Sequence, residues 1–269
     1  MSSLATSPLF LAFVAGMFTY LMTAIGAAGV YLHRDPTPRS MDVLLGFSAG
    51  VMLAASFWSL LAPSAAIAEQ RGGLVWVPTA VGFAVGGLSL WGLDKLMPHI
   101  HAMMPGGTVQ EGIVTKWRRS TLLLLAITLH HIPEGLAIGV AAGAAGAGVP
   151  EASVGAAVAL GLGLGIQNLP EGLAVSTMLM REGATRRRAF TLGQFTGAVE
   201  PLAAVAGAAL VVMSSALLPY ALAFAAGAMI YVVIEELVPE CRRSGHADAA
   251  VLASILGFTL MTVLDLVVG

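Results

Sequence analysis

The sequence contains a short polar phrase, His130-His131-Ile132-Pro133-Glu134-Gly135, inside an apolar run at 121–140. Nearly the same phrase returns 37 residues later as Gln167-Asn168-Leu169-Pro170-Glu171-Gly172. In each copy two polar side chains precede the glutamate by three and four residues, which an α-helix brings one turn from the carboxylate. Imidazole, carboxylate and amide groups without a thiolate are ligands typical of divalent first-row metals such as Zn²⁺ or Fe²⁺. The repeat therefore predicts two half-sites for a metal cation.

A third acid, Glu200, lies beside Pro201 in another apolar segment. A charge in the middle of a membrane span costs at least ~2.5–3.5 kcal/mol on the insertion scale. These segments carry no Lys or Arg that could pair with Glu134, Glu171 and Glu200. Either the acids are protonated or a cation from outside the chain neutralises them. The pattern indicates a chain that needs a cation.

Composition indicates which elements must position these groups. Of 269 residues, 57% are hydrophobic and only 10% are charged, with a mean hydropathy of +0.87. Soluble domains carry about 25% charged residues, so an integral membrane protein is predicted. The apolar runs do not alternate with period two, which favours a helical bundle over a barrel.

Taking roughly 20 residues for one crossing of the bilayer, we predict eight spans in one polytopic domain that covers residues 1–269. The net charge of −2 suggests no nucleic-acid partner, and a single cysteine, Cys241, excludes an intramolecular disulfide or a cysteine-built metal site. A polar loop at about 95–119 separates the third and fourth spans. The predicted spans are about 8–32, 42–66, 74–94, 120–145, 150–179, 189–213, 217–239 and 249–268.

Basic residues predict the orientation of the bundle. Every Lys and Arg except Arg71 falls in the loops that follow spans one, three, five and seven. The positive-inside rule places these loops in the cytoplasm and both termini outside. The two polar phrases then lie near the middle of antiparallel neighbouring spans, which is the layout of transporter binding sites. Pro133 and Pro170 are expected to kink and partly open the helices there.

Other polar residues have weaker claims. On composition alone, Met52 is expected to be a residue that only packs between helices. Glu235 and Glu236 are ambiguous between a transport pathway and a helix interface. His99 and His101 could capture metal in the cytoplasmic loop, although such a loop is more often simply solvated. Ser59 and Asp265 are further pathway candidates, Asp265 near the outer end of span eight.

These motifs resemble those of the ZIP (Zrt/Irt-like) divalent-metal transporters, particularly the GufA-like branch. The resemblance extends over spans two to eight and includes Gly46-Phe47-Ser48-Ala49-Gly50, both Pro-Glu-Gly phrases, Gly193-Gln194 through Glu200-Pro201, and Glu235-Glu236-Leu237-Val238-Pro239-Glu240. It implies an all-α fold of eight spans in a 3+2+3 inverted repeat. It also implies elevator-type movement of spans one, four, five and six against spans two, three, seven and eight.

The resemblance further implies a site for two metal ions. One position would be formed by Met52, His130, Glu134, Gln167 and Glu171, and Met52 becomes a ligand on this ground alone. The second would be formed by His131, Asn168, Glu171 and Glu200, with Glu171, or Glu171 and Glu134 together, bridging the two positions. Three residues depart from common family patterns: His131 stands where many members have Asn, Asn168 where some have Asp, and Gln167 where other branches have His. Metal selectivity and occupancy of the second position are the properties that these departures affect.

The leading hypothesis is a carrier that moves Zn²⁺, or Fe²⁺, Mn²⁺ or Cd²⁺, into the cytoplasm, with the metal as substrate and no prosthetic group. Its expected location is the inner membrane of a bacterium, and the sequence leaves a homodimer open. An intramembrane metal-dependent hydrolase is disfavoured because no His-Glu-x-x-His helix is present and the ligands are duplicated. A passive cation channel would share the same acids.

Overall fold

The computed structural model describes residues 7–32, 36–72, 74–96, 99–100, 110–111, 119–241 and 245–269. Within these ranges, eight helical segments are long and apolar enough to cross a membrane, as predicted. The predicted bounds agree within a few residues, and span two extends furthest beyond its prediction, to Arg71. In order, the spans are Pro8–Tyr31, Pro38–Arg71, Trp76–Leu96, Leu124–Gly146, Val154–Arg181, Arg186–Met213, Ser215–Cys241 and Ala247–Val268.

Several spans join more than one helical element. Spans one and six contain short 3₁₀ turns, η1 and η3, and span seven begins with a third, η4. Spans two and seven contain π-helical segments, η2 and η5. In chain order the elements are α2 (Pro8–Ala28), η1 (Gly29–Tyr31), α3 (Pro38–Ala54), η2 (Ala55–Leu61), α4 (Ala62–Arg71), α5 (Trp76–Leu96), β1 (His99–Ile100), β2 (Gln110–Glu111), α6 (Arg119–Gly146), α7 (Val154–Arg181), α8 (Arg186–Thr196), η3 (Gly197–Val199), α9 (Glu200–Met213), η4 (Ser215–Leu217), α10 (Leu218–Val232), η5 (Val233–Leu237), α11 (Val238–Cys241) and α12 (Ala247–Val268).

Side-chain caps explain where three of these helices begin. Thr37, Ser153 and Thr185 each have an extended backbone and accept a hydrogen bond from the backbone N–H three residues later. This bond satisfies one of the free N–H groups of the first helical turn. The caps place the starts of spans two and six a few residues before the apolar runs that predicted them.

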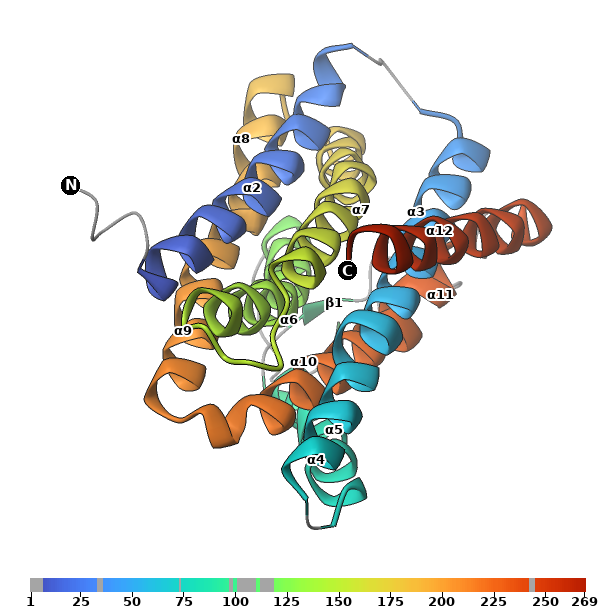
Figure 1. The fold of residues 1–269 in the computed structure, drawn as a ribbon. Helices are drawn as coiled ribbons and strands as arrows, with labels where there is room; N and C mark the ends of the chain where they lie inside the picture. Colours follow the sequence, from blue (N-terminus) through green and yellow to red (C-terminus); the bar gives the residue numbers. More distant parts are fainter. Residues whose placement is uncertain are drawn as a thin grey trace.

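The helices fall into two groups that the ribbon shows on opposite sides of the molecule (Figure 1). Within the first group, α2 packs extensively on α7 and α6 packs on α9. Within the second group, α3 packs on α12 and α5 on α10. Fewer contacts join the groups, chiefly between α6 and α10 and between α7 and α3. The division is the one that the resemblance implies, with spans one, four, five and six in one group.

The packing also has the pattern of an inverted repeat. Spans one and five pack together as spans six and four do, and spans two and eight pack together as spans seven and three do. The π-helical segments η2 and η5 lie on spans two and seven, which are equivalent in this scheme. The helical arrangement therefore fits the predicted 3+2+3 fold.

The glycine that follows each motif glutamate allows close helix contact. A Cβ on Gly135 would lie 2.6 Å from the carbonyl oxygen of Glu200, and a Cβ on Gly172 would lie 2.2 Å from that of Thr23. The first polar phrase is thus pressed against span six and the second against span one. Small residues at such crossings let helix backbones approach closely.

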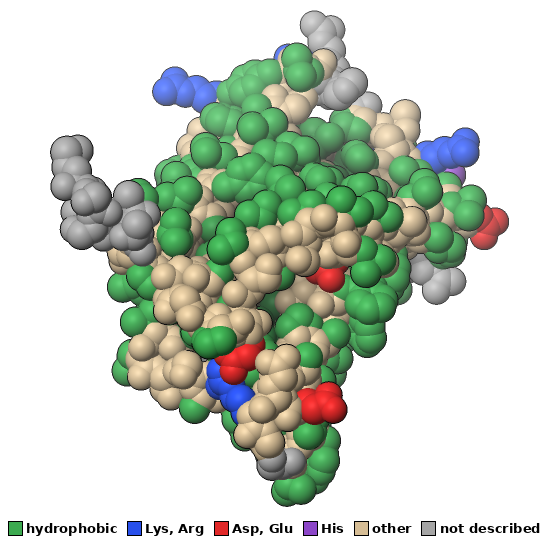
Figure 2. All heavy atoms as spheres, viewed as in Figure 1, with side chains coloured by type: hydrophobic (Ala, Val, Ile, Leu, Met, Phe, Trp, Pro, Cys, Tyr) green, Lys and Arg blue, Asp and Glu red, His purple; other side chains and the backbone are tan. Residues whose placement is uncertain are grey.

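The prolines of the two phrases do not interrupt their helices. Helices α6 and α7 continue through Pro133 and Pro170. The partly opened turns expected from the sequence are therefore not visible as breaks. Hydrophobic side chains are spread over the whole face drawn in Figure 2, and most of the charged side chains on this face lie toward its upper and lower ends. This distribution agrees with a bundle that spans a bilayer.

Candidate metal centre

The structure brings the two polar phrases together in the protein interior. His131, Glu134, Gln167 and Asn168 are each at most 1% exposed, and Glu171 is 9% exposed. One potential ligand atom from each of His131, Glu134 and Glu171 lies within 4.8 Å of the others. Helices α6 and α7 thus converge on one cluster, as the repeated motif predicted.

Glu200 joins this cluster from span six. It is the first residue of α9, directly after the 3₁₀ turn η3. Pro201 follows in the first turn of α9, where the N–H group that proline lacks would have no partner within the helix. The side chain is fully buried. Its Oε1 atom accepts a hydrogen bond from the Thr23 hydroxyl at 3.3 Å, and both of its oxygens lie 3.0 Å from the Asn168 amide nitrogen.

His131 contacts two of the acids. Its Nδ1 atom lies 2.8 Å from Oε1 of Glu200 and 3.5 Å from Oε2 of Glu134. These are ion-pair contacts, and Nδ1 has no hydrogen-bond partner among the described residues. On the other side of the ring, Nε2 lies 3.4 Å from the Thr196 hydroxyl. The imidazole therefore bridges spans four and six.

Buried acceptor atoms without a partner mark one part of the cluster. Neither carboxylate oxygen of Glu134 has a hydrogen-bond partner among the residues that the structure describes, and the same holds for Oε1 of Gln167. Buried polar atoms are nearly always hydrogen-bonded, so such exceptions require an explanation. A divalent cation would satisfy both side chains, because carboxylate and amide oxygens are metal ligands.

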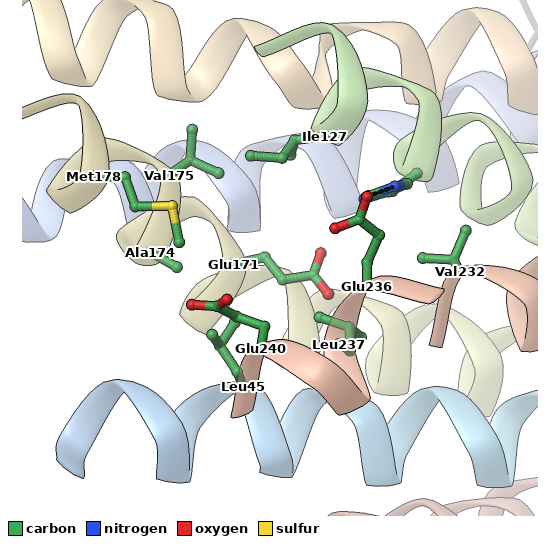
Figure 3. Close-up of a pocket in the computed structure, with 11 residues that line it drawn as sticks. Leu45, Ile127, Glu171, Ala174, Val175, Met178, Val232, Glu236, Leu237 and Glu240 are labelled. Atoms are coloured by element: carbon green, nitrogen blue, oxygen red, sulfur yellow. Dashed lines mark ion pairs between the residues drawn. The ribbon is translucent and has the colours of Figure 1, made fainter. Parts of the chain in front are cut away.

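His130 faces a different space from His131. It lines a pocket together with Glu171, and its Nε2 atom lies 3.7 Å from Oε1 of Glu236. Figure 3 shows the carboxylates of Glu171, Glu236 and Glu240 directed into the region between α7 and the end of span seven. From the i, i+4 spacing, His130 is expected to lie on the same helical face as Glu134. In the structure it is His131 that contacts Glu134.

This pocket leads from the cluster to one end of the bundle. Its lining includes Leu45 near the start of α3, Ile127 in the first half of α6, Met178 near the end of α7 and Glu240 in α11. All four helix ends adjoin the loops that contain the basic residues. By the positive-inside rule this end faces the cytoplasm.

Met52 is completely buried on α3. One turn earlier, Ser48 donates a hydrogen bond of 3.0 Å to the backbone carbonyl of Gln167. Residues four apart share a face of a helix, so Met52 belongs to the face of α3 that meets the second polar phrase. The role of Met52 as a ligand stays a prediction.

The pathway candidates have different surroundings. Ser59 donates a 2.7 Å hydrogen bond to Asp265, which connects spans two and eight. Glu236 lines the pocket, whereas its neighbour Glu235 is not among the lining residues. His99 belongs to the two-residue strand β1, of whose side chains nothing is described, and His101 lies outside the described residues.

Sequence reasoning missed several polar partners. Thr19 and Thr23 of span one and Thr196 of span six contact Asn168, Glu200 and His131. A lone threonine in an apolar helix usually bonds its own backbone, as Thr19 also does here with Gly16. The one sequence signal for these threonines is that they are polar residues in apolar spans that pack against the spans of the acids.

In the part of the chain that the structure describes, eight apolar helical segments surround a buried cluster of carboxylates, a histidine and amides, which defines an integral membrane protein with a candidate cation site between its spans. The sequence matches the family described as ZIP zinc transporter over residues 109–265. It is 39% identical to zinc transporter ZIP11 of Bos taurus, over 98% of this chain and 98% of the relative. It is 38% identical to zinc transporter GufA of Myxococcus xanthus, over 95% and 98%. It is 36% identical to zinc transporter ZIPB of Bordetella bronchiseptica, over 96% and 81%.

The chain therefore belongs to the ZIP family of zinc transporters. It is a multi-pass membrane protein for divalent metal transport and not an enzyme, so the hydrolase alternative is set aside.

Proposed function

We propose that this chain carries Zn²⁺ into the cytoplasm through a mid-span site formed by Met52, His130, Glu134, Gln167 and Glu171. The observation that carries the proposal is the group of buried acceptor atoms on Glu134 and Gln167 that have no hydrogen-bond partner among the described residues. Uncompensated carboxylates within a membrane are costly, and a bound divalent cation removes that cost. The cluster is therefore suited to a charged substrate that arrives and leaves.

The pocket supports the inward direction. It runs from Glu171 and His130 past Glu236 to the end of the bundle that carries the basic loops. A metal ion released from the site would meet two further carboxylates, Glu236 and Glu240, on this route. On the other side, Ser59 and Asp265 are proposed to lie along the entry route. In a bacterial cell the membrane would be the inner membrane.

The two helix groups support alternating access. The first group carries Glu134, Gln167, Glu171 and Glu200, while Met52 and Glu236 belong to the second. Movement of the first group along the second would carry the site from one side of the membrane to the other. Fewer contacts between the groups than within them favour such a rigid-body movement.

Zinc uptake into proteoliposomes tests the proposal. We expect His130→Ala and Glu171→Ala to lower the uptake rate at least tenfold, because each removes a ligand. Glu69→Gln is the matched control, since Glu69 is an exposed acid on α4 at the other end of the bundle. Wild-type rates in both ligand variants would refute the site assignment.

The same vesicles distinguish a carrier from a channel and measure selectivity. A carrier shows saturable uptake and accelerates exchange when unlabelled metal is trapped inside. Uptake that stays linear with zinc concentration and shows no exchange would favour the channel. Competition by Fe²⁺, Mn²⁺ and Cd²⁺ would rank the substrates.

A further inference from the structure

The candidate ligands divide into two sets, which differ in whether their buried polar atoms have hydrogen-bond partners. Glu134 and Gln167 retain buried acceptor atoms that have no hydrogen-bond partner in the described structure. Asn168 and Glu200, in contrast, bond to each other and to residues of span one. The first set, together with Nδ1 of His131, which also has no hydrogen-bond partner among the described residues, is open to a metal ion in this arrangement.

The contacts of Asn168 fix the orientation of its amide. The Nδ2 atom lies 3.0 Å from both oxygens of Glu200 and 3.2 Å from the carbonyl oxygen of Thr19. A carboxylate and a backbone carbonyl only accept hydrogen bonds, so the group that faces them must be the NH₂. The Oδ1 atom of Asn168 consequently faces away from Glu200.

The orientation of the Asn168 amide also determines the orientation of the Gln167 amide. The Nε2 atom of Gln167 donates to Oδ1 of Asn168. With its NH₂ group held there, Gln167 presents Oε1, which is buried and has no partner among the described residues. Glu200 therefore orients Asn168, and Asn168 orients the ligand oxygen of Gln167.

The same contacts leave little access for a second ion at Glu200. The Oε1 atom of Glu200 is surrounded by the Thr23 hydroxyl at 3.3 Å, the Asn168 amide at 3.0 Å and Nδ1 of His131 at 2.8 Å. An amide nitrogen that donates hydrogen bonds does not coordinate a metal. An ion here would have to displace the network that orients Gln167.

We infer that this chain binds one divalent ion, at the proposed site that contains Glu134, Gln167 and Glu171, and that Asn168 and Glu200 are positioning residues for Gln167 rather than ligands of a second ion. The inference rests on the proposed function, since it concerns the same site. Aspartate at position 168 would lack the NH₂ group, would face Glu200 with a like charge, and would offer that carboxylate pair to a second cation.

The test is the number of Zn²⁺ ions bound per chain, measured on the purified full-length protein in detergent by elemental analysis and by titration calorimetry. We expect one ion for the wild type and two for Asn168→Asp. Two ions in the wild type would overturn the inference and leave the proposed function intact. No bound ion in a folded wild-type protein would instead refute the proposed site itself.

A double-mutant cycle tests the positioning role. Gln167→Ala and Asn168→Ala are each expected to weaken zinc affinity roughly tenfold or more. If Asn168 acts through Gln167, the double variant is no weaker than Gln167→Ala alone. Multiplied losses would overturn the positioning role. Melting temperatures establish that each variant is folded, and Asn168→Asp gives the positive readout that general misfolding cannot produce.

Discussion

The guanidinium of Arg71 lies 3.1 Å from the carboxylate of Glu151 and also donates to the backbone carbonyl of Ser215. Arg71 ends span two, Glu151 lies between spans four and five, and Ser215 begins span seven. The ion pair thus joins the two helix groups at the end opposite the basic loops. By the positive-inside rule this end is extracytoplasmic.

Breaking this ion pair is expected to favour separation of the groups at that end. Spin labels at exposed positions 69 and 147, in a Cys241→Ala background, would report the separation. We predict a longer distance in Arg71→Ala, and wild-type distances in Arg71→Lys. Because an exposed ion pair contributes about 0–1 kcal/mol, the change in population should not exceed about fivefold. Unchanged distances in Arg71→Ala would contradict this role.

The same labels test a pH dependence. Hydrogen bonding to Arg71 holds the pKa of Glu151 below its usual value. A lowered pKa in the folded chain stabilises this arrangement above the usual glutamate pKa of about 4.3, and the effect is lost as the pH falls through the lowered value. We expect constant distances from pH 7 down to the usual glutamate pKa, and longer ones once the pH falls through the lowered value. Glu151→Gln should show no transition in that range.

Glu235 and Glu236 form a matched pair on η5, since only Glu236 lines the pocket near His130. We predict that Glu236→Gln slows zinc uptake several-fold, because it removes a carboxylate from the release route. Glu235→Gln should keep a near wild-type rate. Equal effects of the two substitutions would argue that η5 matters for packing and not for the route of the ion.

Zinc binding should weaken as the pH is lowered. Carboxylate ligands must be deprotonated to coordinate a metal, so protons compete with Zn²⁺ at Glu134 and Glu171. Calorimetric titrations between pH 7.5 and 5.5 would measure the change in Kd. An affinity that does not depend on pH would count against both glutamates as ligands.

Gly172→Ala should destabilise the bundle. The added Cβ would lie 2.2 Å from the backbone oxygen of Thr23, and a backbone atom cannot simply rotate away. Overpacking of this kind costs about 1–3 kcal/mol. Gly92→Ala is the control, because no atom lies within 4 Å of its added Cβ in the described structure. We expect a lower Tm only for Gly172→Ala.

Hydropathy predicted the helical spans well because a bilayer imposes length and apolar composition on every crossing. The two polar phrases predicted the helices that carry the buried cluster of His131, Glu134 and Glu171, since each acid stands out in an apolar run. The confirmed features therefore depend on local composition. The π-helical segments left no comparable signal, because they depend on packing between spans.

The sequence also could not predict which residues of the cluster contact one another. Helical spacing allowed either histidine to face Glu134, and the rotation of α6 against its neighbours decides that His131 does. The bonds of Asn168 to Glu200 depend on how α7 meets α9 and α2. Thr23 belongs to the cluster because span one packs against the second polar phrase, and the sequence does not predict that packing.

The close contacts of Gly135 and Gly172 have a consequence for symmetry. Equivalent glycines meet Glu200 in one half of the molecule and Thr23 in the other, so these two residues occupy corresponding places. Corresponding residues that also touch, here at 3.3 Å, must lie beside the pseudo-twofold axis. Two carboxylates at that axis would repel each other, whereas a hydroxyl and a carboxylate form a hydrogen bond. The halves can close around the axis because their side chains there are unequal.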